Sequence, residues 1–192
     1  MPRGRPIVGV DIDGVLGNQV HGVLQRVKER LGVDLDFEHV VHWDLPLGGT
    51  SFVPEIADAM KDPRYVLNMP VHDGARGMLK VLSEHYSVKL ITVRPAESMV
   101  LTEQWLARNG LVYDELVPAG EALKSRHGAD ALVDDYPQNL VEFLERTAGV
   151  GVLVDQPWNQ TGEDLAVWLD GPRLTRVSNL LDVPTWLDGA LQ

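Results

Sequence analysis

The strongest constraint on the fold lies in residues 7–15, which read Ile7-Val8-Gly9-Val10-Asp11-Ile12-Asp13-Gly14-Val15. The first four residues are apolar and mostly β-branched, which is typical of a buried strand. Two carboxylates, Asp11 and Asp13, follow one residue apart, and Gly14 then favours a turn. The pattern predicts a buried strand that ends by delivering two acidic side chains into a loop.

Strand-like runs recur along the chain and alternate with helical patterns. Buried strands are expected over residues 88–93, 131–133 and 150–154, and helices over 75–85 with Asp73 as N-cap, 96–109 ending at Gly110, and 136–146 with Pro137 in the first turn. Alternation of this kind predicts an α/β fold, a Rossmann-like doubly wound parallel sheet. Ligands are then expected at the carboxyl ends of the strands.

Residues 17–70 do not fit that alternation, because a connection between two neighbouring parallel strands needs far fewer residues. Helices are expected at 20–31 and 54–60, with an irregular segment between them. We therefore expect a small helical cap, inserted after the first strand, that folds over its end. Residues 1–16 and 71–192 would form the core domain, closed by an edge strand near 174–177 and a short helix.

Composition excludes several classes of function. The chain of 192 residues has 17 Lys and Arg against 28 Asp and Glu, a net charge of -11, which argues against a nucleic-acid polymer as partner. It has no cysteine, so any metal must be held by oxygen or by histidine. No stretch approaches the roughly 20 apolar residues of a membrane span. We expect no membrane partner, a cytoplasmic location, and a monomer or homodimer.

The acidic residues suggest a cation site. Asp11 and Asp13 suit a divalent cation that prefers oxygen, above all Mg²⁺, although Asp-x-Asp-Gly can also be only a turn. Asp134 and Asp135 end another apolar run, and neighbouring parallel strands would bring them close to the first pair. Four converging carboxylates would repel one another unless a cation binds. One of Asp134 and Asp135 could instead serve only to cap the helix near Pro137.

Two further residues would suit a phosphoryl group. Thr92 ends another predicted strand, and its hydroxyl, followed by the backbone N–H groups of Val93 and Arg94, could hold phosphoryl oxygens. Lys124 precedes the strand that ends in the acidic pair, where an ammonium would neutralise negative charge. The alternatives are ordinary strand packing for Thr92 and a solvated surface position for Lys124.

Taken in order, these motifs between residues 7 and 135 resemble the four motifs of the haloacid dehalogenase-like phosphatase superfamily. The resemblance implies a Mg²⁺-dependent phosphohydrolase with a capped Rossmann-like core. Asp11 would be the nucleophile that forms an aspartyl-phosphate, Asp13 the general acid/base, and Thr92 and Lys124 the phosphoryl holders. The Mg²⁺ ligands would be the Asp11 side chain, the Asp13 backbone carbonyl and a carboxylate of Asp134 or Asp135. The haloalkanoate branch is disfavoured, because it replaces the second aspartate.

The chain is similar in finer detail to the 5′(3′)-deoxyribonucleotidase group. The shared features are the start of the first motif, the Ile-Thr-x-Arg-Pro segment around Thr92, Pro137 and Asn139 after the acidic pair, the loop 156–159, and Arg176 with Val177. This resemblance implies a (deoxy)nucleoside monophosphate as substrate. A sugar phosphate or biosynthetic intermediate, a phosphomutase reaction, and a member that binds a phosphorylated ligand without turnover remain alternatives.

Three residues have two possible roles each. In the nucleotidases, aromatic residues of the cap stack on the base, and Trp43 and Phe52 are the candidates here. The alternative is that both form the core of the cap. Arg94 either contacts the substrate or pairs with an acidic neighbour.

Overall fold

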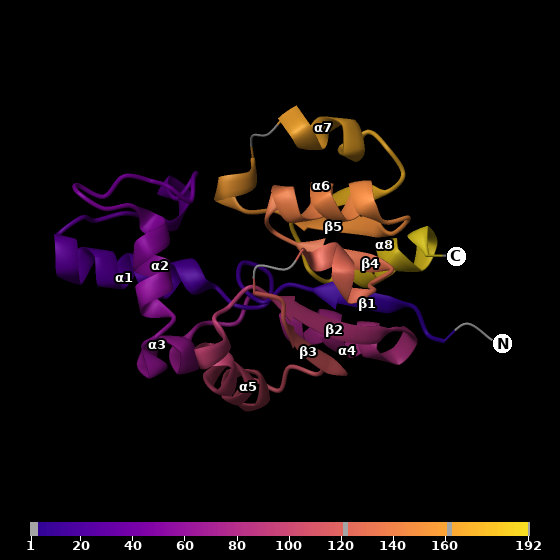
Figure 1. Cartoon of the computed structure of the whole chain (residues 1–192), viewed down its shortest axis with the longest axis horizontal. Helices are drawn as coiled ribbons and strands as arrows, with labels where there is room; N and C mark the ends of the chain where they lie inside the picture. The colour runs from indigo at the N-terminus through magenta and orange to yellow at the C-terminus, as the bar shows by residue number, and fades with distance from the viewer. Residues whose placement is uncertain (1–3, 121–122, 161–162, 192) are drawn as a thin grey trace.

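The computed structural model describes residues 4–120, 123–160 and 163–191. Six parallel strands form one sheet with the order β3-β2-β1-β4-β5-β6 (Figure 1). The strands are β1 (Ile7–Val10), β2 (Ser87–Thr92), β3 (Glu115–Pro118), β4 (Ala131–Asp134), β5 (Val150–Val154) and β6 (Leu174–Val177). The predicted doubly wound, Rossmann-like α/β fold is confirmed.

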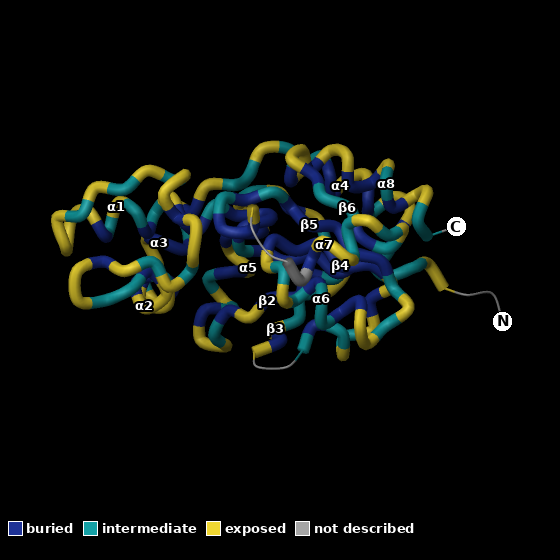
Figure 2. The backbone as a smooth tube through the Cα atoms, turned by 90° about the horizontal axis from the view of Figure 1, so that it is seen from above, coloured by how far each residue is buried: buried dark blue, intermediate teal, exposed yellow. Residues whose placement is uncertain are grey.

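Helices cover both faces of the sheet. Those that pack with one apolar cluster are α4 (Ala75–His85), α5 (Met99–Arg108) and α8 (Asp182–Ala190), whereas α6 (Pro137–Arg146) and α7 (Glu163–Leu169) pack with the other. Strand side chains alternate between the clusters, so Val133 contributes to the first and Leu132 to the second. The central strands are accordingly buried on both faces, as Figure 2 shows in dark blue.

Three helices stand apart from the sheet, at the left of Figure 1. They are α1 (Gln19–Leu31), α2 (Phe52–Ala59) and α3 (Pro63–Asn68), and a 3-10 turn, η1 (Phe37–His39), follows α1. These elements share their own apolar cluster, built around residues such as Val23, Phe52 and Tyr65. We refer to residues 17–70 as the cap; its boundaries stay a prediction.

Entry to and exit from the cap run side by side. The N–H of Asn18 donates to the carbonyl of Pro70 at 2.8 Å, and the N–H of His72 donates to the carbonyl of Leu16 at 2.9 Å. Between these two bonds, Gly17 forms a bridge with Val71. The cap is therefore attached through a paired neck rather than through two independent linkers.

Several local expectations were incomplete. β3 and α3 were not predicted, because β3 is a short edge strand with little apolar pattern and α3 has only six residues. The N-cap of α4 is Gly74, with a φ of 82°, and not Asp73. The helix expected over 96–109 begins as a 3-10 turn at Ala96–Ser98 and continues as α5. None of these differences moves the central strands.

The order of the strands fixes where a ligand can bind. β1 lies between β2 and β4, and because all three are parallel, the residues that follow them meet at one edge of the sheet. In a doubly wound sheet this edge, at the point where the strand order reverses, is where ligands bind. Across the described residues, no helix has the length and apolar character that crossing a membrane requires.

Candidate active site

Three buried carboxylates meet at this edge. Asp11 follows β1, Asp134 ends β4 and Asp135 comes next, and each offers an oxygen within 4.8 Å of the others. Burial raises the pKa of Asp11 to about 7 and raises the pKa of Asp135 well above its usual range, with the negative charge of Asp134 adding to both. Three carboxylate oxygens this close together can all reach one divalent cation, and the cation would offset their mutual repulsion.

Lys124 enters the same cluster. It begins a 3-10 turn, η3 (Lys124–His127), and its Nζ lies 2.9 Å from Oδ2 of Asp11 and 2.7 Å from Oδ2 of Asp134. Burial on its own would lower the pKa of this lysine, but the two carboxylates outweigh that effect and raise it. Lys124 is therefore a buried, charged ammonium beside Asp11 rather than a solvated surface residue.

Asp134 and Asp135 have different neighbours. Oδ1 of Asp134 accepts a 2.8 Å hydrogen bond from the N–H of Tyr136, and the side-chain amide of Asn139 donates to both of its oxygens. Asp134 thus fixes Lys124 and the start of α6. Oδ2 of Asp135 accepts a 2.7 Å hydrogen bond from the indole N–H of Trp158, whereas its Oδ1 accepts none from the described residues. Asp135 is the member of the pair with an oxygen to spare.

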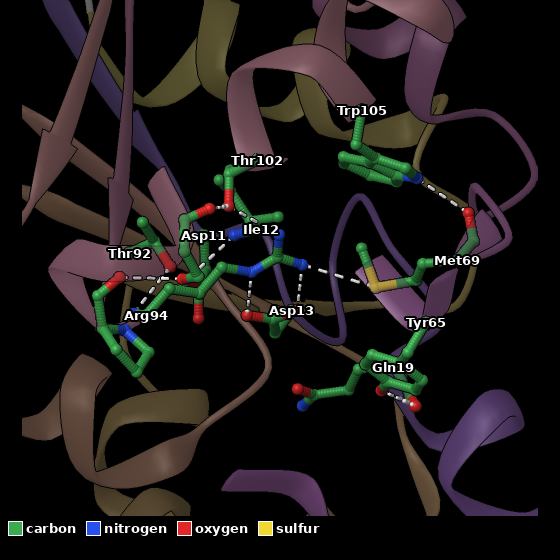
Figure 3. A network of polar contacts seen from close by, with 12 residues as sticks. Asp11, Ile12, Asp13, Gln19, Tyr65, Met69, Thr92, Arg94, Thr102 and Trp105 are labelled. Atoms are coloured by element: carbon green, nitrogen blue, oxygen red, sulfur yellow. Dashed lines mark hydrogen bonds and ion pairs between the residues drawn. The ribbon is translucent and has the colours of Figure 1, made fainter. Parts of the chain in front are cut away.

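Asp13 does not join the other carboxylates, so the expected convergence of four is wrong and three converge. Its carboxylate forms a two-pronged ion pair with Arg94, with Nε 2.7 Å from Oδ2 and Nη2 2.5 Å from Oδ1 (Figure 3). Arg94 is 3 % exposed, and its guanidinium offers Asp13 two parallel donors. The carboxylate of Asp13 is thus paired with a cation of its own, although its negative charge still adds to the raised pKa of Asp11.

The guanidinium of Arg94 has further contacts besides Asp13, and these fix its position. Nη1 donates to the hydroxyl of Thr102 at 3.0 Å, and Nη2 contacts Sδ of Met69 at 3.3 Å. The guanidinium also lies 5.7 Å from the ring centroid of Trp105, whose own N–H donates to the Met69 carbonyl. Of the two roles considered for Arg94, the structure shows the second, in which it pairs with an acidic neighbour, Asp13.

Thr92 ends β2 and is fully buried. Its hydroxyl oxygen accepts a 3.2 Å hydrogen bond from the backbone N–H of Arg94, which closes a small turn at the strand end. The side chain of Val93 is 57 % exposed, so Val93 presents only its backbone to this turn. Thr92 and Val93 therefore occupy the strand end next to β1, as the sequence predicts.

The two aromatic candidates of the cap differ in exposure. Phe52 has no exposed surface and lies in the apolar cluster of the cap, so in this structure it offers no face to a ligand. Trp43 is half-buried and borders a cleft of about 480 Å³ between the cap and the start of α6. Other residues along this cleft include His42, Asp44, Val53, Tyr136, Gln138 and Trp158.

Sequence reasoning assigned no role to the loop after β5, which contains the 3-10 turn η4 (Pro157–Asn159). Gln156 donates to the carbonyl of Gly14 at 2.6 Å, and Asn159 donates to the carbonyl of Asp135 at 2.7 Å. Arg176 in turn donates to Oδ1 of Asn159 at 2.9 Å. The sequence does indicate that this loop lies near the site, because it follows a predicted parallel strand and so leaves the same edge of the sheet as the three strands that carry the motifs.

Comparison with known proteins gives the family of the chain. Residues 5–174 match the family model described as "5' nucleotidase, deoxy (Pyrimidine), cytosolic type C protein". A Bacillus subtilis protein named "Putative nucleotidase YqfW" is 23 % identical over 189 residues, covering 94 % of this chain and 93 % of that protein. A Staphylococcus epidermidis protein named "Putative 5'(3')-deoxyribonucleotidase" is 26 % identical over 148 residues, covering 72 % and 79 %.

Solved structures agree on the fold. A haloacid dehalogenase-like hydrolase from Streptococcus pneumoniae superposes with a TM-score of 0.65 at 14 % identity, covering 95 % of this chain and 98 % of that one. The L-2-haloacid dehalogenase PA0810 gives 0.62 at 13 % identity, covering 97 % and 100 %. The protein has the fold of the haloacid dehalogenase-like hydrolases. Because the family model covers most of the chain, the protein belongs to the cytosolic type C 5′ nucleotidase family, whose members hydrolyse phosphoric monoesters.

Proposed function

We propose that this protein is a Mg²⁺-dependent phosphatase that hydrolyses a (deoxy)nucleoside monophosphate through a phosphoryl group carried on Asp11. The observation that carries the proposal is the placement of Lys124 between Asp11 and Asp134, with Asp135 beside them. A carboxylate is a poor nucleophile toward a phosphate dianion unless cationic groups offset the charge of both. The family supports hydrolysis of a phosphate ester, and the two named relatives support a nucleotide.

The chemistry of the donors fits Mg²⁺. Carboxylate and carbonyl oxygens are the ligands that this ion prefers. Oδ1 of Asp135 has no hydrogen-bond donor among the described residues, and Asp135 lies so close to Gly14 that a Cβ there would approach Oδ2 to 2.2 Å. We propose the Asp11 side chain, the Asp13 backbone carbonyl and the Asp135 carboxylate as ligands, while Asp134 holds Lys124. When bound, Mg²⁺ would neutralise charge on the phosphoryl oxygens.

The residues of the chain then divide the reaction into two displacements. In the first, an oxygen of Asp11 attacks phosphorus and the bond from phosphorus to the leaving oxygen breaks, while Asp13 donates a proton to that oxygen. In the second, Asp13 accepts a proton from water as the water oxygen attacks phosphorus, which releases phosphate and restores Asp11. Lys124, the Thr92 hydroxyl and the Val93 N–H would hold the phosphoryl oxygens throughout.

Arg94 would position Asp13 for both proton transfers. Its two N–H groups hold both carboxylate oxygens, and its own position is fixed by Thr102 and Met69. The ion pair fixes the direction in which the Asp13 carboxyl group points. We therefore assign Arg94 an orienting role rather than a contact with the substrate.

The cleft beside Trp43 would receive the leaving group. Its volume of about 480 Å³ lies in the usual range for small-molecule sites, and a base stacked on an aromatic ring gains about 1–3 kcal/mol. The residues along the cleft include Asp44 but neither Lys nor Arg, which favours a leaving group without a second phosphate. A sugar phosphate is the second candidate, because His42, Asp44 and Gln138 could bond to its hydroxyl groups. A cytoplasmic location and a monomeric or homodimeric state remain part of the proposal.

Phosphate release from a substrate panel tests the function directly. We expect the purified protein with Mg²⁺ to hydrolyse deoxynucleoside monophosphates faster than sugar phosphates and nucleoside 3′,5′-bisphosphates, and to lose activity on chelation with EDTA and regain it with added Mg²⁺. Colorimetric phosphate detection measures each rate. Faster turnover of sugar phosphates would favour the second candidate, and binding of mononucleotides without any release would support a non-catalytic member.

The substitution Asp11→Asn should lower kcat by about 10⁴-fold or more, because the amide is not a nucleophile toward phosphorus. Substrate binding, followed by calorimetry, should persist, since Lys124 and Thr92 are unchanged. Asp34→Asn is a matched control, because Asp34 forms an exposed pair with Lys28 on the cap. Full activity of Asp11→Asn would exclude Asp11 as the nucleophile.

The substitution Gly14→Ala should weaken Mg²⁺ binding by at least about 10-fold, because the new Cβ displaces the carboxylate of Asp135. Gly110→Ala is the control for backbone strain: Gly110 has a φ of 62°, similar to the 78° of Gly14, but a Cβ there would meet no atom within 4 Å. Calorimetric titration of each variant with Mg²⁺ measures the affinity. Equal losses in both variants would mean that strain, and not Asp135, is responsible.

The substitution Arg94→Lys should lower kcat by about 10–100-fold with little change in KM, because an ammonium cannot hold both oxygens of Asp13 in fixed positions. Arg30→Lys, which changes a cap arginine paired with Glu55 and Asp58, is the matched control. Steady-state kinetics separate the two constants. An increase in KM alone would indicate that Arg94 contacts the substrate instead.

A further inference from the structure

We propose that Trp158 links the position of the cap to the affinity of the cation site, by fixing the carboxylate of Asp135 only while its ring is packed against the cap. This inference rests on the proposed role of Asp135 as a cation ligand. Trp158 borders the cleft proposed for the leaving group, but it contacts none of the reacting atoms, and in this inference it acts as a positioning residue.

The first part of the link is a hydrogen bond in the core domain. The indole N–H of Trp158 donates to Oδ2 of Asp135 at 2.7 Å, and Trp158 is 8 % exposed. An indole is a donor only, so this contact has one possible direction. With Oδ2 engaged, the carboxylate is oriented and Oδ1 remains available for a cation. Groups that orient metal ligands in this way typically contribute 10–100-fold to metal affinity.

The second part is an aromatic contact with the cap. The ring of Trp158 lies 4.6 Å from the ring of Trp43 and 5.8 Å, edge to face, from the ring of Phe37. Both partners belong to the cap, and Trp158 is buried in the apolar cluster of the cap, although it lies on a loop of the core domain. The ring of Trp158 therefore packs against the cap, while its indole N–H bonds to Asp135 in the core domain.

The loop is bonded to the core independently of the cap. The side-chain amide of Asn159 donates to the carbonyls of Asp135 and Val154, and that of Gln156 donates to the carbonyl of Gly14. With the loop held in this way, we infer that the contacts with Trp43 and Phe37 keep the Trp158 ring in the orientation that its bond to Asp135 needs. A shift of the cap would release the ring and, with it, the N–H donor. By linkage, cation binding that favours the oriented carboxylate must favour the packed cap to the same extent.

The experiment measures binding of Mg²⁺ alone to the full chain by calorimetry, without substrate. Trp158→Phe keeps the aromatic ring and removes the donor, and we expect Mg²⁺ affinity to fall about 10-fold or more. Trp168→Phe is the matched control, because Trp168 lies on α7 and its ring packs against Arg173 and a cluster of the core domain, not against the cap. Circular dichroism establishes that each variant folds.

The cap side is tested with Trp43→Leu, which leaves Trp158 and Asp135 unchanged. We expect a loss of a few-fold in Mg²⁺ affinity, and no further loss when Trp43→Leu is added to Trp158→Phe, since both act through one hydrogen bond. Mg²⁺ should also slow amide hydrogen exchange of residues 37–43 in the unsubstituted protein and not in Trp158→Phe. Additive losses, or slowed exchange in both proteins, would overturn the coupling. Trp43→Leu alone decides the question if Trp158→Phe does not fold.

Asp135→Asn separates this inference from the proposed function. If the unsubstituted protein binds no Mg²⁺, or if Asp135→Asn binds it equally well, the proposed cation site is wrong. If Asp135→Asn loses Mg²⁺ while Trp158→Phe retains it at full affinity, the cation site stands and the role of Trp158 is wrong.

Discussion

The buried ammonium of Lys124, held 2.9 Å from Asp11 and 2.7 Å from Asp134, is the contact on which the rest of the site depends. Removing three charges from water is costly, and a buried arrangement of this kind persists only when the charges are paired and oriented. β1 and β4 provide that orientation, because they are neighbours in the sheet and end at the same edge. The order of the strands therefore places Asp11 and Asp134 next to each other, and the positive charge of Lys124 offsets the repulsion between them.

Four acidic residues of the motifs acquire different properties from their neighbours. Asp11 and Asp134 share Lys124, Asp13 is paired with Arg94, and Asp135 is bonded to Trp158 through one oxygen only. A net charge of -11 suggests a generally acidic surface, yet these carboxylates are largely buried and individually partnered. The division of roles in the proposed mechanism follows from these partners. The nucleophile lies beside a cation, the acid/base is oriented by a guanidinium, and the ligand for Mg²⁺ keeps a free oxygen.

Much of this arrangement is predictable from the sequence. The apolar runs before Asp11 and Asp134 predict buried parallel strands, and parallel strands bring their carboxyl ends together whatever the details of the loops. The pairing of Asp13 with Arg94 is not predictable in this way. Residues 13 and 94 lie on different loops, and the direction of a side chain in a loop depends on contacts made by the whole fold.

For the same reason, the sequence leaves open which of Asp134 and Asp135 would bind the metal. The two residues are adjacent in the sequence, but in the fold Asp134 contacts Lys124 and Asp135 contacts Trp158. The sequence does not separate Phe52 from Trp43: both pack with the apolar cluster of the cap, but Phe52 is buried in it on α2 while Trp43 also borders the cleft. The role of Trp158 depends on contacts with both units at once. Because the loop that carries Trp158 follows β5, the sequence predicts that this loop reaches the site. It does not predict the packing of the Trp158 ring against Trp43, because that contact depends on where the cap lies.

The most direct test of this account is identification of the residue that carries the phosphoryl group. The protein would be mixed with Mg²⁺ and a deoxynucleoside monophosphate, quenched rapidly in acid and treated with borohydride, which reduces an aspartyl-phosphate to homoserine. Mass spectrometry of the peptides should find homoserine at position 11 and at no other aspartate. Turnover of the nucleotide without modification of Asp11, or with modification at another residue, would contradict the account.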